Sequence, residues 1–379
     1  MTQTRTKNQV FINFIYILFL LISILTLVII PKQAITTFGQ GVNLWATKVL
    51  PSLLPFFILT KLLSYTTFVN SAGRILSPIT KKLYGVGGVA GYIYFISIVS
   101  GYPVGAKLTS DLYEQKAINR EQAKAISSFT STSGPLFILG TVGIGFFNSS
   151  RLGIIVLISH LISALLNGLL YRNKEAEFIS PAIPKPTSQN QLSDSMYNSV
   201  ISIMMVGGFI AIFYMGLKLM LQLNIFSPII FLLSKCGIDE QVSASLIAGM
   251  IEVTTGLSIL GSSSIKLKLS TVLASVLISF GGLSIHAQAF CYLKNFGLKY
   301  SHFLKQKVTN AILAALVTLL IILLIWYAMQ LLKILLYIAI LLHFNNRYQQ
   351  STFSICHIIF YAFYSCQVYT QVAQAKHWL

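Results

Sequence analysis

Apolar segments long enough to cross a lipid bilayer recur along the chain, and they constrain its fold more than any other feature. A bilayer core of about 30 Å needs about 20 helical residues. The first segment, Val10 to Ile30, is followed by Pro31 instead of a small-residue cleavage site, so it predicts a retained transmembrane helix. Further apolar segments lie at about 48–65, 87–106, 126–147, 152–170, 199–223, 242–262, 269–293, 308–342 and, more weakly, 353–370. Together they predict nine or ten membrane segments.

Composition excludes the main soluble alternatives. Of 379 residues, 55% are hydrophobic and only 9% are charged, against roughly 25% charged in soluble domains. So few charges cannot cover the surface of a soluble enzyme or solvate a disordered chain. The excess of 27 basic over 9 acidic residues has no dense basic tract, which argues against nucleic acid as a partner. Most cations lie between apolar segments, where they orient helices and contact lipid headgroups. The sequence predicts an integral protein of the bacterial cell membrane.

An internal repeat divides the chain into two halves. Leu76-Ser77-Pro78-Ile79 matches Phe226-Ser227-Pro228-Ile229, and shorter matches pair Gly105 with Gly256 and Ser128-Phe129 with Ser279-Phe280. Each half shows a span, a short Ser-Pro piece, two interrupted segments and a further span. We predict an all-α polytopic membrane protein with two homologous halves, each containing broken or re-entrant helices, and inverted repeats if one segment per half is re-entrant. The predicted regions are 1–40 (membrane helix and interfacial segment), 41–171 (first repeat), 172–195 (polar linker), 196–335 (second repeat) and 336–379 (tail).

Two interrupted segments in the first half carry the first candidate residues. Glycine and proline within a few residues cannot continue a helix, and freed backbone groups at membrane depth must line protein or a water-filled cavity. In the second of them, hydroxyl residues precede Gly-Pro, which predicts a capped half-helix whose N-terminus attracts anions. The candidate substrate-binding residues are Ser100, Gly101, Tyr102, Pro103, Gly105, Lys107, Thr132, Ser133, Gly134 and Pro135. Simple proline kinks, with Lys107 reaching the interface, are the structural alternative.

Glu252 is the one acidic residue inside an apolar segment. An intramembrane carboxylate costs several kcal/mol and suggests a functional role. We predict that Glu252, with Thr254 and Thr255, binds a coupling cation or carries a proton. Pairing with Lys107 of the other half, functional or purely structural, is the alternative.

The fourth interrupted segment contains a glycine pair followed by polar groups. Gly281 and Gly282 should break the helix, and Ser284, His286 and Gln288 follow at membrane depth. His286 could move a proton or bind a carboxylate, or it could be hydrogen-bonded to its neighbours. We predict that all five residues bind substrate. His160, in an uninterrupted segment, is expected to be structural.

Enzymatic and metal-binding patterns are not evident in the sequence. It has no H-E-x-x-H, G-x-S-x-G or Walker A motif, and its four cysteines lack metal-ligand spacing. We therefore expect neither an enzyme nor a cofactor nor a metal. The expected partners are a small anionic substrate and the bilayer, and a homo-oligomer is left open.

At the four interrupted segments the sequence resembles the sporulation integral membrane protein family called YlbJ, which carries the nucleoside-recognition Gate domain. The motifs are Ser-Gly-Tyr-Pro-Val-Gly-Ala-Lys (100–107), Thr-Ser-Gly-Pro-Leu-Phe-Ile-Leu-Gly-Thr-Val (132–142), Glu-Val-Thr-Thr-Gly (252–256) and Gly-Gly-Leu-Ser-Ile-His-Ala-Gln (281–288). The resemblance implies a duplicated helical fold akin to gated nucleoside transporters. It also implies movement of dipicolinic acid, a small aromatic dicarboxylate, across the outer forespore membrane of a spore former. A nucleoside transporter and a non-transporting scaffold of a sporulation complex are the alternatives.

Overall fold

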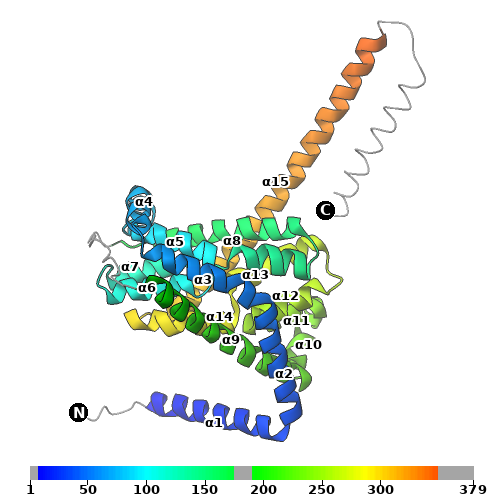
Figure 1. Cartoon of the computed structure of the whole chain (residues 1–379). Helices are drawn as coiled ribbons and strands as arrows, with labels where there is room; N and C mark the ends of the chain where they lie inside the picture. The colour runs from blue at the N-terminus through cyan, green and yellow to red at the C-terminus, as the bar shows by residue number, and fades with distance from the viewer. Residues whose placement is uncertain (1–6, 175–189, 349–379) are drawn as a thin grey trace.

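Helices make up all the regular structure in the described part of the chain. A computed structural model describes residues 7–174 and 190–348, and no strand occurs within these ranges (Figure 1). The predicted all-α membrane fold with broken helices in both halves is confirmed. Most of the predicted linker and the last part of the predicted tail, including the aromatic segment 353–370, lie outside the described residues.

The first half begins with two peripheral helices and continues into the interrupted segments. Helix α1 ends at a sharp bend of 105° before Pro31, which occupies the first turn of α2. The elements are α1 (Lys7–Ile29), α2 (Pro31–Leu44), the π-helix η1 (Trp45–Val49), α3 (Leu50–Ser64), α4 (Phe68–Tyr84), α5 (Val89–Ser100), α6 (Val104–Glu114), α7 (Arg120–Ser127), the π-helix η2 (Phe137–Phe146) and α8 (Ser150–Leu170).

The second half repeats the order of α3 to α8. A long helix is followed by a Ser-Pro helix, two helix pairs separated by breaks, and a final long helix. These are α9 (Gln191–Gln222), α10 (Ser227–Lys235), α11 (Glu240–Ile251), α12 (Val253–Gly261), α13 (Leu267–Phe280), α14 (Gly282–Leu293), a short 3₁₀ turn η3 (Lys294–Phe296) and α15 (Tyr300–Tyr348). The four breaks therefore lie between α5 and α6, α7 and η2, α11 and α12, and α13 and α14.

Several of the predicted membrane segments are not single full-length helices. Among the described residues four helices are long and apolar enough to cross a membrane, and six if each bent pair counts as one span. The nine or ten predicted segments include four interrupted ones, and these are divided into short half-helices. Helices α5, α6, α11 and α12 have only 9 to 12 residues each, and about 20 are needed to span a bilayer.

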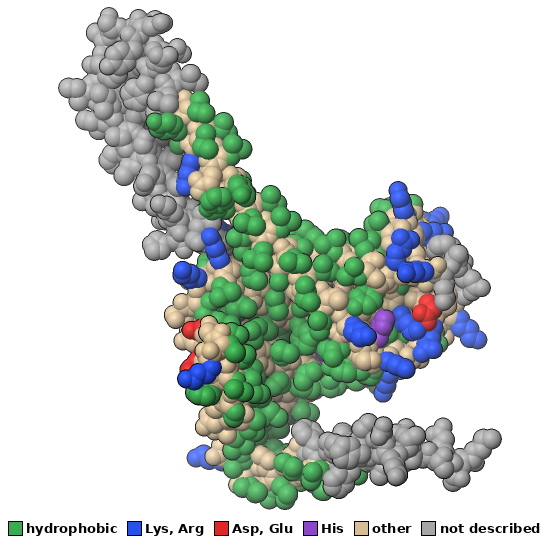
Figure 2. Space-filling view, turned by 180° about the vertical axis from the view of Figure 1, so that it is seen from behind, with side chains coloured by type: hydrophobic (Ala, Val, Ile, Leu, Met, Phe, Trp, Pro, Cys, Tyr) green, Lys and Arg blue, Asp and Glu red, His purple; other side chains and the backbone are tan. Residues whose placement is uncertain are grey.

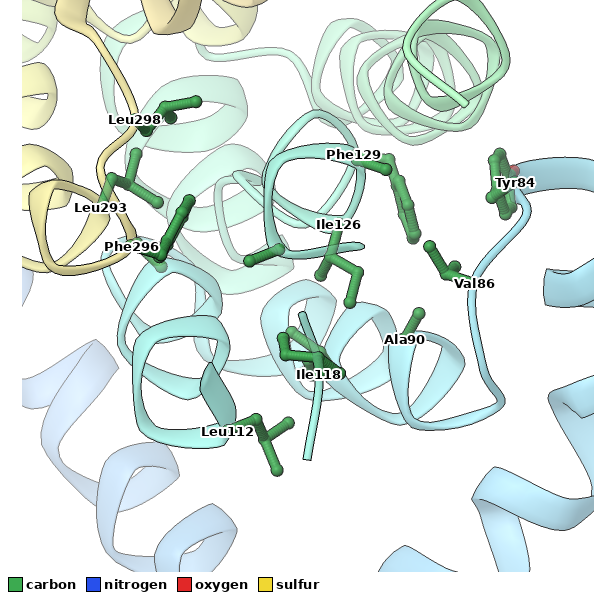
Figure 3. Packing of buried hydrophobic residues seen from close by; sticks show 14 of the residues in the cluster. Tyr84, Val86, Ala90, Leu112, Ile118, Ile126, Phe129, Leu293, Phe296 and Leu298 are labelled. Carbon is green, nitrogen blue, oxygen red and sulfur yellow. The ribbon is translucent and has the colours of Figure 1, made fainter. Parts of the chain in front are cut away.

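Apolar packing fixes the half-helices against the long ones. One cluster of buried residues joins α5, α6 and α7 to the end of α14, so it links the two halves (Figure 3). In this cluster the rings of Tyr84 and Phe129 stack with centroids 4.4 Å apart. A second cluster joins η2 and α8 to α12 and α13, and a third joins α3 to α9. The breaks are consequently enclosed by packed side chains.

The outer surface is that of a membrane protein. Figure 2 shows a face dominated by hydrophobic side chains, with lysine and arginine gathered toward its margins. Large apolar side chains such as Met204 and Ile212 of α9 are each 57% exposed. The last part of α15 projects away from the helical body (Figure 1), and its apolar residues Leu331, Leu332 and Tyr337 are exposed as well. Such surfaces are stable in lipid.

Candidate substrate site at four helix breaks

The first break lies between α5 and α6. Helix α5 ends at Ser100, Gly101 adopts a left-handed φ of 74°, and α6 begins at Val104 directly after Pro103. A Cβ atom on Gly101 would lie 2.7 Å from the backbone nitrogen of Gly134. The first and second breaks therefore pass each other in backbone contact, which only a glycine permits.

The second break is an extended stretch of four buried hydroxyl residues, Thr130 to Ser133. Helical structure resumes at Pro135, where the missing N–H costs nothing. The Ser133 N–H donates to Nε2 of His160 over 2.9 Å, and His160 Nδ1 lies 2.8 Å from the Ser279 hydroxyl of the second half. A backbone N–H can only donate, so Nε2 is unprotonated and the neutral ring donates from Nδ1 to Ser279. His160 thus connects the second break to the end of α13.

The third break is a single residue, Glu252, which lies between α11 and α12. It is only 1% exposed. One carboxylate oxygen accepts hydrogen bonds from the Thr254 N–H at 3.1 Å and the Thr254 hydroxyl at 2.8 Å. The other accepts from the N–H and the hydroxyl of Thr255, both at 2.7 Å. Glu252 is therefore the N-cap of α12, where its negative charge meets the positive end of the helix dipole.

Glu252 does not pair with Lys107. Among the described residues, Lys124 and Glu121 of α7 form an ion pair. Lys107 instead donates to the Ser202 hydroxyl of α9 at 3.2 Å. The alternative of an inter-half ion pair was wrong because the threonines that follow Glu252 already satisfy both of its carboxylate oxygens.

The fourth break lies at the glycine pair between α13 and α14. Gly281 and Gly282 have φ values of 93° and 68°, and a Cβ on Gly282 would lie 2.8 Å from the Gly249 carbonyl oxygen. The third and fourth breaks therefore also pass each other in backbone contact. His286 binds the end of α13 at this break, because its Nε2 donates to the Phe280 carbonyl at 2.8 Å and its Nδ1 accepts from the Tyr300 hydroxyl at 3.2 Å.

All four breaks meet at one small cavity, which we name the central cavity. Its volume is about 60 Å³. Elements η1, α3 and α9 complete its wall with the apolar residues Val49, Leu53, Val206 and Ile210. Eight of the residues predicted from sequence line it, two from each break: Gly101, Tyr102, Ser133, Gly134, Glu252, Thr254, Ser284 and Gln288.

The other predicted residues lie around the central cavity instead of in its wall. Pro103 and Pro135 start helices, and Gly105, Gly281 and Gly282 allow close backbone packing. The Ser100 hydroxyl donates to Thr60, Thr132 is buried beside Ser133, and Thr255 and Lys107 line two neighbouring cavities. In the described part of the chain, no group of three His, Cys, Asp or Glu side chains is placed to hold a metal ion.

Lys307 of α15 is a buried cation that lies outside the four sequence motifs. It is 2% exposed, its ammonium donates to the Tyr102 hydroxyl and to the Ser131 carbonyl at 3.4 Å, and it lies 4.8 Å from the centre of the Tyr102 ring. It therefore contacts the first two breaks directly. The signal that could have identified it is the polar stripe that it forms with Gln306 and Asn310 inside a helical segment.

Comparisons with known proteins agree with the motifs. The family described as "Gate: Nucleoside recognition" matches residues 46–150, which include the first two breaks. Sporulation integral membrane protein YlbJ of Bacillus subtilis (strain 168) is 29% identical over 313 residues, covering 75% of this chain and 76% of that protein. An outward-facing structure of a CNTnw variant is 15% identical with a TM-score of 0.39, covering 73% of this chain and 76% of that one. The predicted resemblance to YlbJ and the Gate domain is confirmed.

Proposed function

We propose that this relative of YlbJ, an integral membrane protein with a Gate domain, transports a small carboxylate anion across the bacterial membrane. Dipicolinate is the first candidate substrate, and the outer forespore membrane is the proposed location if the source organism forms spores. The proposed binding site is the central cavity. Paired helix breaks in duplicated halves, meeting at one cavity, are the arrangement in which secondary transporters bind substrate.

The buried ammonium of Lys307 is the observation that favours an anion. Its hydrogen-bond partners are a hydroxyl and a carbonyl, and none of the described carboxylates forms an ion pair with it. A buried charge without an opposite charge is costly. Tyr102 separates Lys307 from the central cavity, so an anion bound there would offset this charge at short range.

Backbone and hydroxyl groups of the breaks supply the remaining contacts for a carboxylate. Gly134 lies in the cavity wall just before the η2 turn, where free N–H groups and the helix dipole favour negative charge. Ser284 and Gln288 of α14 face the same space and can donate hydrogen bonds. These groups bind a carboxylate without adding further formal charge.

Glu252 is the residue that would couple the proposed transport to a proton or cation gradient. An ionised carboxylate in the cavity wall repels a bound anion, and a proton or a cation bound at Glu252 removes that repulsion. We therefore assign ion or proton coupling to Glu252 with its two threonine partners. Uptake should then be faster with an inward gradient of protons or sodium ions.

Flux in proteoliposomes tests the proposal. Purified protein should take up labelled dipicolinate, and Lys307→Met should lower the initial rate at least about tenfold, since a tenfold rate change corresponds to about 1.4 kcal/mol. Lys305→Met removes an exposed lysine one half-turn away and should transport like the original chain. Absence of dipicolinate flux under either gradient would overturn the substrate, and full activity of Lys307→Met would overturn the role of Lys307.

A nucleoside is the second candidate substrate, and Glu252 is the observation that favours it. A carboxylate, an amide and a hydroxyl in one cavity wall suit a neutral ligand rich in hydroxyl groups. Uptake of labelled uridine or adenosine that dipicolinate does not compete with would favour this candidate. Absence of flux for all three compounds would favour a scaffold role in a sporulation complex.

A further inference from the structure

A winding stripe of α9 carries six residues four positions apart, and each lines a cavity. Asn198 and Ser202 line a cavity beside α6, which we name the α6 cavity. Val206 and Ile210 line the central cavity. Tyr214 and Lys218 line a larger cavity beside α2, which we name the α2 cavity. Each step of four residues turns by about 40° around a helix, so the six residues form a stripe that winds about half a turn around α9 and passes the three cavities in order. We name this stripe the path face.

The segment opposite α9 shows the same order. Thr60 and Lys61 of α3 line the α6 cavity, and Leu53 lines the central cavity. Thr47 and Lys48 of η1 line the α2 cavity. The two walls therefore run side by side past all three cavities. Their close packing is visible in the third apolar cluster, which contains residues of both.

The chemistry changes along this line from polar to apolar and back to polar. The α6 cavity contains Lys61 and Lys107 with one carboxylate, Asp111. The α2 cavity contains Lys48 and Lys218 with no carboxylate in its wall. Between them the two walls contribute only apolar side chains to the central cavity. Two basic compartments are thus separated by an apolar constriction beside the four breaks.

The cavity sizes show that the line is widest at its α2 end. The central cavity has about 60 Å³ and the α6 cavity about 50 Å³. The α2 cavity has about 330 Å³, within the range of small-molecule sites. Thr254 lines both the central and the α2 cavity, so the start of α12 is a shared wall of these two.

We infer that this face of α9, with η1 and α3 opposite, is the wall of a path for small anions, with a lysine-bearing mouth at each end. The inference rests on the proposed function and adds the route to it. The lysines at each mouth raise the local concentration of anions, because basic clefts focus the electrostatic field. The constriction formed by Val49, Leu53, Val206 and Ile210 closes the path by excluding water, as hydrophobic gates do.

Cysteine accessibility in membrane vesicles tests the route without requiring transport. Single cysteines are placed on a chain whose four native cysteines are serines, and charged, water-soluble methanethiosulfonate reagents are added. Ser202→Cys and Tyr214→Cys lie on the path face, and Met204→Cys and Ile212→Cys lie on the opposite face two residues away. Path-face cysteines should react at least tenfold faster, although Met204 and Ile212 are the more exposed side chains, because those two face lipid.

Comparing an anionic with a cationic reagent tests whether the lysines attract anions at the ends of the path. The Lys218 ammonium lies 5.5 Å from the centre of the Tyr214 ring. An anionic reagent should therefore react faster than a cationic one at Tyr214→Cys, and adding Lys218→Met should reduce that ratio about threefold. Equal reaction on both faces of α9 would overturn the path, and a ratio unchanged by Lys218→Met would overturn the mouth. A path-face reaction without dipicolinate flux would leave the path standing and reject the proposed substrate.

Discussion

The two halves of the molecule break their helices at matching places but stabilise the breaks in different ways. In the second half the third break is held by local bonds, and the fourth break has a local bond as well. Glu252 binds groups two and three residues away, and the Phe280 carbonyl is bound by a side chain six residues away. In the first half the partners are distant. Ser133 is bound from 27 residues away, the Ser128 carbonyl from 39 and the Ser131 carbonyl from 176.

This difference means that the third break is self-contained and the first two are not. The third break keeps its geometry through the cap of its own helix, whereas the fourth also receives His160 and Asn310 at Ser279. The breaks of the first half depend on α8 and α15, which supply His160, Asn167 and Lys307. A shift of α15 would therefore alter the first two breaks and leave the third in place.

The close backbone contacts at glycines should be equally essential in both halves, and substitutions there should have the largest effects on stability. A Cβ on Gly105 would lie 2.0 Å from the Thr130 carbonyl oxygen. A Cβ on Gly282 would lie 2.8 Å from the Gly249 carbonyl oxygen, and Gly282 also has a left-handed φ of 68°. Gly105→Ala and Gly282→Ala should each lower the free energy of unfolding by about 4 kcal/mol or more, since neither backbone can move away. Thermal unfolding in detergent measures this.

Gly216→Ala is the matched control for both crossings, because a Cβ there meets nothing within 4 Å. It should leave the unfolding midpoint unchanged or raise it slightly, as alanine favours a helix over glycine by about 0.5–1 kcal/mol. A stable Gly105→Ala variant would show that the first two breaks are not in contact.

Removing the cap of the second half should have an intermediate effect. Glu252→Gln replaces one acceptor oxygen with a donor, so two of the four hydrogen bonds are lost at a buried helix end. The free energy of unfolding should fall by about 2–3 kcal/mol, the usual value for hydrogen bonds to a charged group. Glu240→Gln, at an exposed position in α11, should change it by less than about 0.5 kcal/mol. Equal effects in the two variants would contradict the cap.

The smallest expected effect separates the two halves most directly. His160→Leu leaves the buried Ser133 N–H without its acceptor and should cost about 1–2 kcal/mol. Amide hydrogen exchange should become faster in peptides covering 128–137 and stay unchanged in peptides covering 249–256. Glu252→Gln should give the reverse pattern. Faster exchange at both places in either variant would show that the breaks are coupled and not separately stabilised.

The sequence was most informative where the cause of the structure is local. Glycine, proline and hydroxyl residues in an apolar segment break a helix through their own conformational limits, so all four breaks could be predicted without a fold. Glu252 could be selected for the same reason, because a carboxylate in an apolar segment is conspicuous. Thr254 and Thr255 were predicted to act with it on an ion or proton, but their capping of its carboxylate is evident only once the chain turns at that residue.

Contacts over long distances were missed. Lys307 lies at the edge of an apolar segment and reads as one of several loop lysines, whereas α15 begins at Tyr300 and buries it. His160 was expected to be structural, yet it joins the second break to the other half. Lys107 was selected because it closely follows the first break in sequence. It lies in α6, the helix after that break, and its side chain lines the α6 cavity.

The polar stripe of α15 has a consequence for biosynthesis. Gln306 binds the Lys124 carbonyl 182 residues earlier, and Asn310 binds the Ser279 carbonyl. A ribosome that has made only the first half has produced interrupted helices without the α15 side chains that bind the Lys124 and Ser131 carbonyl groups, and lipid offers no replacement for them. Chains truncated before α15 should be recognised by membrane quality-control proteases, because part of the hydrogen bonding of their first half is missing.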